Sequence, residues 1–228
     1  MPVIRSARLR AVLRVLLPCV LIPLLVALGA TIFPERLHLL ITLGVTLLSL
    51  LLFITGFERR RTGSRRMVLT AVMAALCVAG RFLPFFKPVT ALTILTAMYL
   101  GGEAGFLTGA LAAMLSNFWF GQGPWTPFQI LAWGMIGFIA GWLAQPLQRS
   151  RVLLLLFGAL SGAAYSMVMD VWTVMWYGGG FRWELYTAAF VTALPHTLLY
   201  AASNLVFLWF LARPVGSKLA RVRLKYGL

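Results

Sequence analysis

The residues best suited to bind a ligand lie in one stretch, from Ser116 to Gln129, which separates two long apolar runs. Five of its fourteen residues are aromatic, and its two Gly and two Pro exclude a regular helix along its whole length. Rings interspersed with amides suit a ligand that is mostly apolar but has polar edges. We therefore predict a binding loop, with ligand contacts from Asn117, Phe118, Trp119, Phe120, Gln122, Trp125, Phe128 and Gln129.

A simpler interpretation of the same rings is an aromatic belt, in which Trp side chains sit at the level of the lipid headgroups. A belt accounts for one or two Trp residues. It does not account for the run Gly-Gln-Gly-Pro-Trp-Thr-Pro at 121–127. The composition favours a functional loop, with the belt as the alternative.

Ionisable residues inside apolar runs are costly in a membrane and therefore indicate function. Arg81 and Asp170 each lie near the end of an apolar run, on the same side of the membrane as the aromatic stretch. Lys87 and Trp183 follow them in the adjoining loops. We predict that these four residues complete a binding site. The structural alternative is that Arg81 extends toward the interface and pairs with Asp170.

Motifs for enzymatic chemistry are absent from the sequence, which has no P-loop, GxGxxG, HExxH or Cys/His cluster. Cys19 and Cys77 lie in apolar runs, without disulfide or metal spacing. A serine protease would need a Ser beside His196, and nothing local supports that pairing. We expect a protein that is not an enzyme and has no metal or cofactor of its own, so that a partner supplies the energy for any transport.

The elements that must position these residues are membrane helices. Of the 228 residues, 61% are hydrophobic and 11% are charged, and the mean hydropathy is +0.91. No soluble domain of this size buries so much apolar surface. The net charge of +15 does not indicate nucleic-acid binding, because the basic residues cluster between the apolar runs. The composition predicts an all-α polytopic membrane protein.

Eight apolar segments follow one another, and a basic stretch divides them. Residues 1–58 predict an N-terminal transmembrane hairpin, and 59–66 predict a basic cytoplasmic linker. Residues 67–212 predict a six-helix membrane domain, and 213–228 a basic cytoplasmic tail. A cleaved signal peptide is the alternative for the first segment, and we favour a retained helix. The segments are 11–33, 37–57, 67–84, 88–100, 103–119, 127–145, 152–177 and 185–212.

The distribution of basic residues predicts the orientation. With both termini in the cytoplasm, sixteen of the 20 Lys and Arg residues lie on the cytoplasmic side and four lie outside. Cytoplasmic loops of membrane proteins carry this excess of basic residues. The stretch from Ser116 to Gln129 therefore faces outward.

Small residues recur every fourth position in several segments. Lipid does not drive helices together through the hydrophobic effect, so close contact between them depends on small side chains. We interpret the glycine rows of 101–113, 137–141 and 158–162 as packing within the chain. The row of Ala71, Ala75 and Ala79 suits either such packing or a flat face for another subunit.

Residues 67–212 resemble the substrate-binding S component of an energy-coupling factor (ECF) vitamin transporter. The pair Ala71-x-x-x-Ala75 matches the AxxxA motif by which those proteins dock on the transmembrane T subunit. The runs 105–113 and 116–127 resemble the cobalamin-specific branch in particular. Residues 1–58 depart from the usual six-helix form.

This resemblance implies a multi-pass protein of the bacterial cell membrane that captures cobalamin (vitamin B12) or a related corrinoid at the outer face. Docking through Ala71, Ala75 and Ala79 would deliver the vitamin to a T subunit that two ATPase subunits drive. An S component for another vitamin, such as riboflavin, is the first alternative. A membrane scaffold or assembly protein without a ligand is the second.

Overall fold

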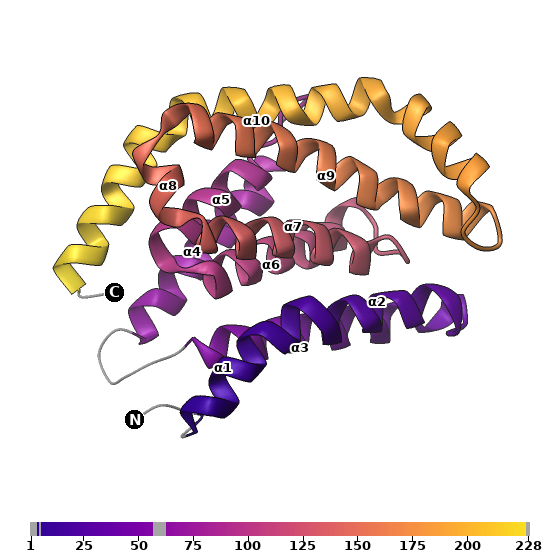
Figure 1. Ribbon diagram of the computed structural model, residues 1–228, viewed down its shortest axis with the longest axis horizontal. Helices are drawn as coiled ribbons and strands as arrows, with labels where there is room; N and C mark the ends of the chain where they lie inside the picture. Colours follow the sequence, from indigo (N-terminus) through magenta and orange to yellow (C-terminus); the bar gives the residue numbers. More distant parts are fainter. Residues whose placement is uncertain (1–3, 5, 57–62, 227–228) are drawn as a thin grey trace.

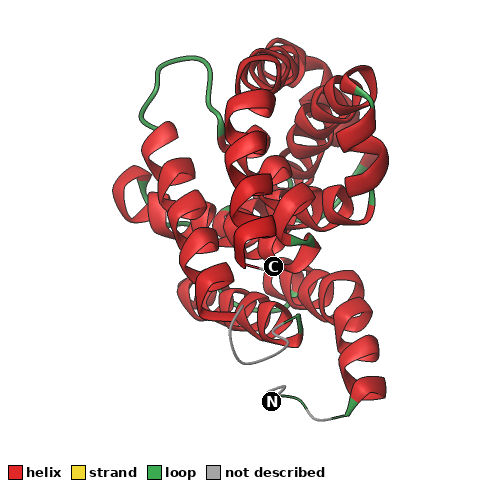
Figure 2. Ribbon diagram, turned by 90° about the vertical axis from the view of Figure 1, so that its left-hand side faces the viewer, coloured by secondary structure: helices red, strands yellow, loops and turns green. Residues whose placement is uncertain are grey.

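The computed structural model describes residues 4, 6–56 and 63–226, and within these residues it contains helices and no strand (Figures 1 and 2). This architecture confirms the predicted all-α class. The N-terminal helices are α1 (Ala7–Leu16), η1 (Leu17–Leu21), α2 (Ile22–Thr31), η2 (Glu35–Leu37) and α3 (His38–Thr55). The core helices are α4 (Gly63–Gly80), α5 (Val89–Leu100), α6 (Gly102–Phe120), α7 (Thr126–Trp142), α8 (Ala144–Arg149), α9 (Arg151–Tyr177) and α10 (Trp183–Tyr226).

Four helices in the described part of the chain are long and apolar enough to cross a membrane. They are Ala7–Thr31, His38–Thr55, Arg151–Tyr177 and Trp183–Tyr226. The first of these spans α1, η1 and α2, and its π-helical turn contains Pro18. Proline has no backbone N–H and clashes with the preceding turn, which explains the local widening.

The predicted N-terminal hairpin is present, and it packs on one side of the core. Helices α2 and α3 run side by side beneath α6 and α7 in Figure 1. Helix α3 contacts both α6 and α7, and α2 contacts α7 and α9. The hairpin therefore covers the face of the core opposite the long α10.

Helix α5 is the centre of the core. It has only 12 residues, and all of them except Tyr99 are buried against α4, α6, α7, α9 and α10. At 1.5 Å per residue, a helix of this length rises about 18 Å, less than the ~30 Å hydrocarbon layer of a bilayer. It ends at Gly101, whose φ of 96° reverses the chain directly into α6.

The glycine rows do pack within the chain, as predicted. A Cβ at Gly109 would lie 2.6 Å from the backbone of Trp133, and one at Gly137 would lie 2.5 Å from the backbone of Gly105. A Cβ at Gly162 would lie 2.7 Å from the backbone of Ala201. Glycine therefore allows the close α6–α7 and α9–α10 contacts.

Both boundaries of α4 differ from those of the predicted segment 67–84. Helix α4 begins at Gly63, inside the predicted linker 59–66, whose residues 59–62 lie outside the described residues. It ends at Gly80 because the chain turns sharply there: a Cβ at Gly80 would lie 2.3 Å from Pro88.

Helix α10 continues past residue 212 through the predicted tail to Tyr226, although Pro214 lies inside it. Figure 1 shows it bending over the core toward the C-terminus. Packing holds this extension, since Gly216 lies against Tyr99 and Leu219 is buried. The predicted tail is therefore helical, and its small and apolar residues pack against the core although many of its other residues are basic.

The bundle has two ends. The turns at 32–37, 121–125 and 178–182 lie at one end, on the right in Figure 1, which we call the aromatic end. Both described termini lie toward the other, which we call the basic end. The loop 81–88 joins the aromatic end, because Phe82 packs on Trp119 and Phe120.

Candidate functional site

Arg81 directly follows α4 and is held by uncharged groups. Its Nη1 atom donates hydrogen bonds to Ser116 Oγ and to Asn117 Oδ1, the latter at 2.7 Å. Its guanidinium lies 4.9 Å from the ring centre of Phe120 and 5.4 Å from that of Trp133. Aromatic faces attract a cation but do not cancel its charge. Arg81 is therefore oriented without being neutralised.

Asn117 couples Arg81 to the rest of the core. Its side chain is buried, and its Nδ2 donates to Thr126 Oγ1 and to Gln129 Oε1, each at 2.8 Å. Gln129 Nε2 donates in turn to the hydroxyl of Tyr165 at 3.2 Å. The network runs from the 81–88 loop through α6 and α7 to α9, so moving one member disturbs the others.

Gln122 shapes the turn between α6 and α7. Its Nε2 donates to the carbonyl of Met114 at 2.9 Å, and its Oε1 accepts from Thr126 Oγ1 at 3.1 Å. A Cβ at Gly123 would lie 2.2 Å from the ring of Trp125, so a side chain there would displace the indole. The distinctive Gly-Gln-Gly-Pro-Trp run is thus explained in part by the geometry of this turn.

A small cavity of about 90 Å³ lies beside this network. Residues from the 81–88 loop and from α5, α7, α9 and α10 surround it. Trp133 and Tyr165 stack on its wall with ring centres 4.7 Å apart and planes 18° apart. The lining residues are Arg81, Lys87, Val89, Thr90, Gln129, Trp133, Tyr165, Tyr200, Ser203 and Asn204.

Among the residues that the structure describes, two cations and no acidic residue line this cavity. Lys87 Nζ lies 5.6 Å from the ring centre of Phe120, and the Lys87 backbone is anchored to Ser203 of α10. Burial lowers the pKa of Lys87, and the nearby Arg81 lowers it further. The cavity therefore has a positive potential that the surrounding residues do not offset.

The predicted ligand contacts divide into three groups. Arg81, Lys87 and Gln129 line the cavity. Asn117 does not line it but makes hydrogen bonds with Arg81 and Gln129. Phe120 contacts both cations. The remaining rings lie elsewhere: Phe118, Trp119 and Trp183 are largely exposed, Trp125 packs on Trp172, and Phe128 is buried against the hairpin beside a smaller apolar cavity.

Asp170 does not pair with Arg81, which corrects the structural alternative. The ion pairs between described residues join Arg14 and Arg66 to Glu103, at the other end of the bundle. Asp170 is 7% exposed, and its Oδ2 atom has no hydrogen-bond partner. It is absent from the cavity lining, so its predicted contact with a ligand remains a prediction.

Several lining residues were missed from sequence: Thr90, Trp133, Tyr165, Tyr200 and Ser203. Trp133 offered a usable signal, because it follows Gln129 by one helical turn and therefore shares its face of α7. Tyr165 and Tyr200 offered none. They belong to α9 and α10, whose packing decides which of their faces meet α7.

The alanine row lies on an open face of α4. Ala71, Ala75 and Ala79 are exposed, whereas Ala74 between them is buried against the core. The row therefore does not serve packing within the described chain. It leaves a flat surface on the first helix of the core.

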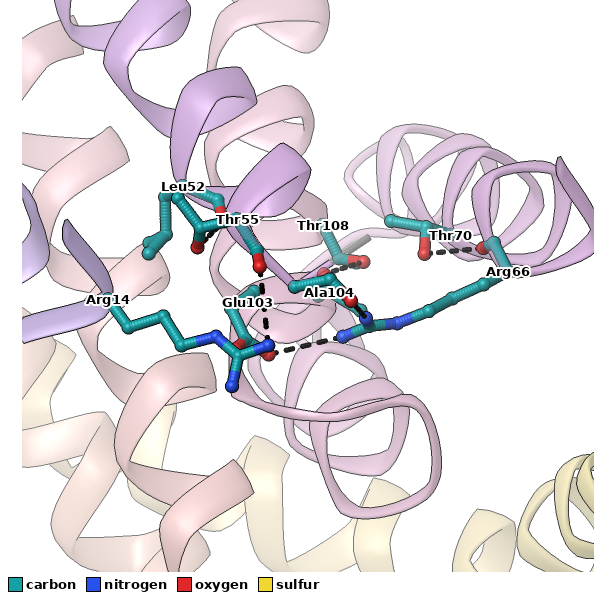
Figure 3. Close-up of polar contacts among 9 residues, drawn as sticks. Arg14, Leu52, Thr55, Arg66, Thr70, Glu103, Ala104 and Thr108 are labelled. Carbon is teal, nitrogen blue, oxygen red and sulfur yellow. Dashed lines mark hydrogen bonds and ion pairs between the residues drawn. The ribbon is translucent and has the colours of Figure 1, made fainter. Parts of the chain in front are cut away.

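At the basic end, Glu103 joins the hairpin to the core (Figure 3). Its carboxylate lies 3.1 Å from Arg14 of α1 and 3.1 Å from Arg66 of α4. Both guanidiniums also donate to backbone carbonyls at the end of α3, Arg14 to Thr55 and Arg66 to Gly56. This acidic residue lies in the first turn of α6, and Thr55 and Gly56 lie at the end of α3. Glu103 is therefore the point where four helices meet.

A larger cavity of about 460 Å³ adjoins this ion-pair cluster, between α1, α6 and α7. Its charged side chains are Arg14 and Glu103, which form an ion pair. The cavity of about 90 Å³ at the aromatic end has two cationic side chains, Arg81 and Lys87, that pair with no acidic residue among those described. We therefore place the candidate site at the aromatic end, because the charges of the cavity there matter more to ligand binding than the larger volume of the other cavity.

These features define a class of protein: an α-helical membrane protein whose core carries a polar, aromatic cavity at one end. The family described as ECF-type riboflavin transporter, S component, matches residues 62–215. The match covers more than half of the chain, and the chain belongs to this family of ECF transporter S components. The match starts where the core starts and leaves the hairpin outside. It does not single out the cobalamin-specific branch. Comparison with curated proteins and with solved structures gave no match.

Proposed function

We propose that this chain is the vitamin-binding subunit of an ATP-driven ECF importer and captures its ligand at the aromatic end. The observation that carries this proposal is the cavity beside Arg81 and Lys87, where a stacked Trp–Tyr pair and unsatisfied cations converge. A largely apolar pocket with a few convergent polar groups is the usual form of a small-molecule site. The excess of basic residues at the other end supports an outward orientation for this one.

A conjugated, planar vitamin of the riboflavin type fits this site best. Trp133 and Tyr165, stacked on each other, give the cavity an aromatic side, and the other lining residues are mostly polar. The description of the matching family also names riboflavin. A cavity of about 90 Å³ is smaller than typical ligand pockets of ~300 Å³ or more. We propose that the 81–88 loop moves on binding and enlarges the cavity to hold the vitamin.

A corrinoid is the second candidate, and the exposed aromatic rim favours it. Phe118 is 69% exposed and Trp119 is 75% exposed, beside Phe82. Large apolar surfaces on a rim suit a ligand too wide to enter the cavity. The resemblance of 116–127 to the cobalamin-specific branch points the same way.

The partners in this proposal are a membrane T subunit and two ATPase subunits. The open row of Ala71, Ala75 and Ala79 supports docking on α4, because small side chains let a second helix approach closely. Neither a nucleotide site nor a catalytic group is needed in this chain, since the ATPases supply the energy. The cell membrane of a bacterium is the location that such a complex implies.

The first test is binding by the purified protein in detergent. The visible absorption spectrum of the fresh protein identifies a flavin or a corrinoid carried through purification, and titrations with riboflavin and with cobalamin follow. Saturable binding of one of these vitamins is expected. Trp133→Leu should weaken it at least tenfold, whereas Trp142→Leu, at the basic end, should not. Binding of neither vitamin, with no other vitamin bound, would overturn the proposal.

The second test separates docking from binding. Ala71→Leu with Ala75→Leu adds bulk to the open face of α4, so uptake by cells should be lost while vitamin binding persists. Ala188→Leu, on an exposed position of α10, is the matched control. Uptake that survives the double substitution would remove α4 from the docking interface.

A further inference from the structure

The cavity at the aromatic end is unusual because its neutral polar groups are largely in use. Thr90 accepts from Trp133 Nε1, and Ser203 bonds the backbone of Lys87. Asn204 donates to the carbonyl of Gly158. The amide of Gln129 is likewise engaged at both ends, by Asn117 and Tyr165. The neutral lining therefore offers a ligand few donors, chiefly the hydroxyls of Thr90, Tyr165 and Tyr200.

The two cations, in contrast, have free bonding capacity. Within the described part of the chain, only the Nη1 atom of Arg81 donates hydrogen bonds, and its buried Nε has no partner. The ammonium of Lys87 makes a ring contact and no hydrogen bond within the described residues. An ammonium has three donors and a guanidinium five, so most of the donor capacity facing the cavity is cationic.

No carboxylate of the described structure compensates this charge. Glu103 is engaged by Arg14 and Arg66 at the basic end, and Asp170 lies outside the lining. Two like charges close together in partly buried surroundings repel each other and lose hydration. An arrangement of this kind becomes favourable when a negative group binds between the two.

We propose that the vitamin captured here carries an anionic group, a carboxylate or a phosphate, which binds between Arg81 and Lys87 while its ring system lies toward Trp133 and Tyr165. This inference rests on the proposed function and narrows its substrate class. It ranks riboflavin 5′-phosphate above riboflavin. More generally, it ranks an acidic vitamin above its neutral amide or alcohol form.

The test compares matched probes that differ only in charge: riboflavin 5′-phosphate with riboflavin, and nicotinate with nicotinamide. We expect the anionic member of at least one pair to bind tenfold or more tightly at low salt. That preference should shrink at high salt, because exposed parts of the site are screened. Lys87→Gln should remove the preference, and Lys87→Arg should retain it.

Arg182→Gln is the matched control, since Arg182 is an exposed cation at the same end and lies outside the cavity lining. It should leave the preference unchanged. Arg81→Lys checks the same site without removing the positive charge. Size-exclusion profiles and melting temperatures establish that each variant is folded.

The outcomes separate the two proposals. Tight binding of riboflavin or cobalamin that neither a phosphate nor Lys87→Gln alters would overturn the anionic class and leave the transport function standing. A carboxylate source and a phosphate source are distinguished by which probe pair shows the preference. Binding of no vitamin in either set would overturn both proposals.

Discussion

The two ends of the bundle hold their arginines in opposite ways. At the basic end, Arg66 is 15% exposed and faces Glu103, which also binds Arg14. At the aromatic end, Arg81 is partly buried, and its partners are a hydroxyl, an amide and two rings. In the first arrangement the charges are compensated within the described chain. In the second, the described residues provide no negative partner, and we propose that the ligand supplies one.

The comparison also explains the position of the added hairpin. Arg14 belongs to the hairpin, whereas Arg66 and Glu103 belong to the core. Their cluster therefore fastens the hairpin to the base of α4, on the helix that also carries the open alanine row. The hairpin should accompany the core in any movement within the membrane.

The largest effect on stability should follow removal of the carboxylate at the basic end. Glu103→Gln leaves Arg14 and Arg66 uncompensated, and breaking a largely buried pair in this way costs about 3 kcal/mol. Thermal unfolding in detergent measures the loss. Glu184→Gln, at an exposed position, is the control and should change little. An unchanged melting temperature in Glu103→Gln would show that the cluster is not what joins hairpin to core.

A smaller loss should follow removal of the amide that supports the aromatic end. Asn117→Ala removes one hydrogen bond from each of Arg81, Thr126 and Gln129, which costs about 2 kcal/mol. Because Arg81 also loses its position, vitamin affinity should fall at least tenfold. Melting temperature and a binding titration on the same sample distinguish the two effects. Wild-type affinity in this variant would contradict a positioning role for Asn117.

The exposed member of the ion-pair cluster should matter less. The side chain of Arg14 is 42% exposed, so water screens its attraction to Glu103. Arg14→Gln should therefore cost at most ~1 kcal/mol of stability. Vitamin binding should remain at the wild-type level, because the cavity lies at the other end. A loss as large as that of Glu103→Gln would mean that the hairpin depends on Arg14 rather than on the whole cluster.

The smallest effect on stability should come from the uncompensated cation. Lys87→Gln removes a charge that has no acidic partner, so stability should change by no more than ~0.5 kcal/mol. The comparison of the two ends would fail if this substitution destabilised the protein as much as Glu103→Gln does.

The pH dependence of the site follows from the same lysine. The lowered pKa of Lys87 means that the folded protein releases this proton before the unfolded chain does, below the ordinary value of 10.5. Stability should therefore rise slightly with pH in that window, as the folded state sheds an unfavourable charge. Affinity for riboflavin 5′-phosphate should fall over the same range, whereas Lys87→Arg should show a flatter profile. A pH-independent affinity in the wild type would exclude Lys87 as an anion contact.

Much of the order of the helices was predictable, because long apolar runs predict membrane helices and the basic stretches between them predict cytoplasmic loops. Helix α4 begins at Gly63, inside the predicted linker, but the position of α5 followed from the apolar run at 88–100. The extension of α10 through Pro214 did not. Its stability comes from contacts such as that of Gly216 with Tyr99, which join residues distant in sequence.

The candidate site was predictable only in part. Arg81, Lys87 and Gln129 were predicted from the sequence as ligand contacts, because charged and amide side chains are rare beside apolar runs. All three line the cavity. The partners Trp133, Tyr165 and Tyr200 come from three helices, and an aromatic residue in a membrane helix is unremarkable until its neighbours are known. The exposed rings at 118 and 119 remain predicted contacts that the cavity does not include.

The sequence by itself determined the class, the order of the helices and the excess of basic residues at one end, because these depend on composition and on positions along one chain. The tertiary structure alone decided which charges are compensated. Glu103 meets Arg14 and Arg66 across three helices, whereas Arg81 meets neutral groups and Asp170 stays apart. Compensation depends on distances of a few ångströms between helices, and helix packing sets those distances.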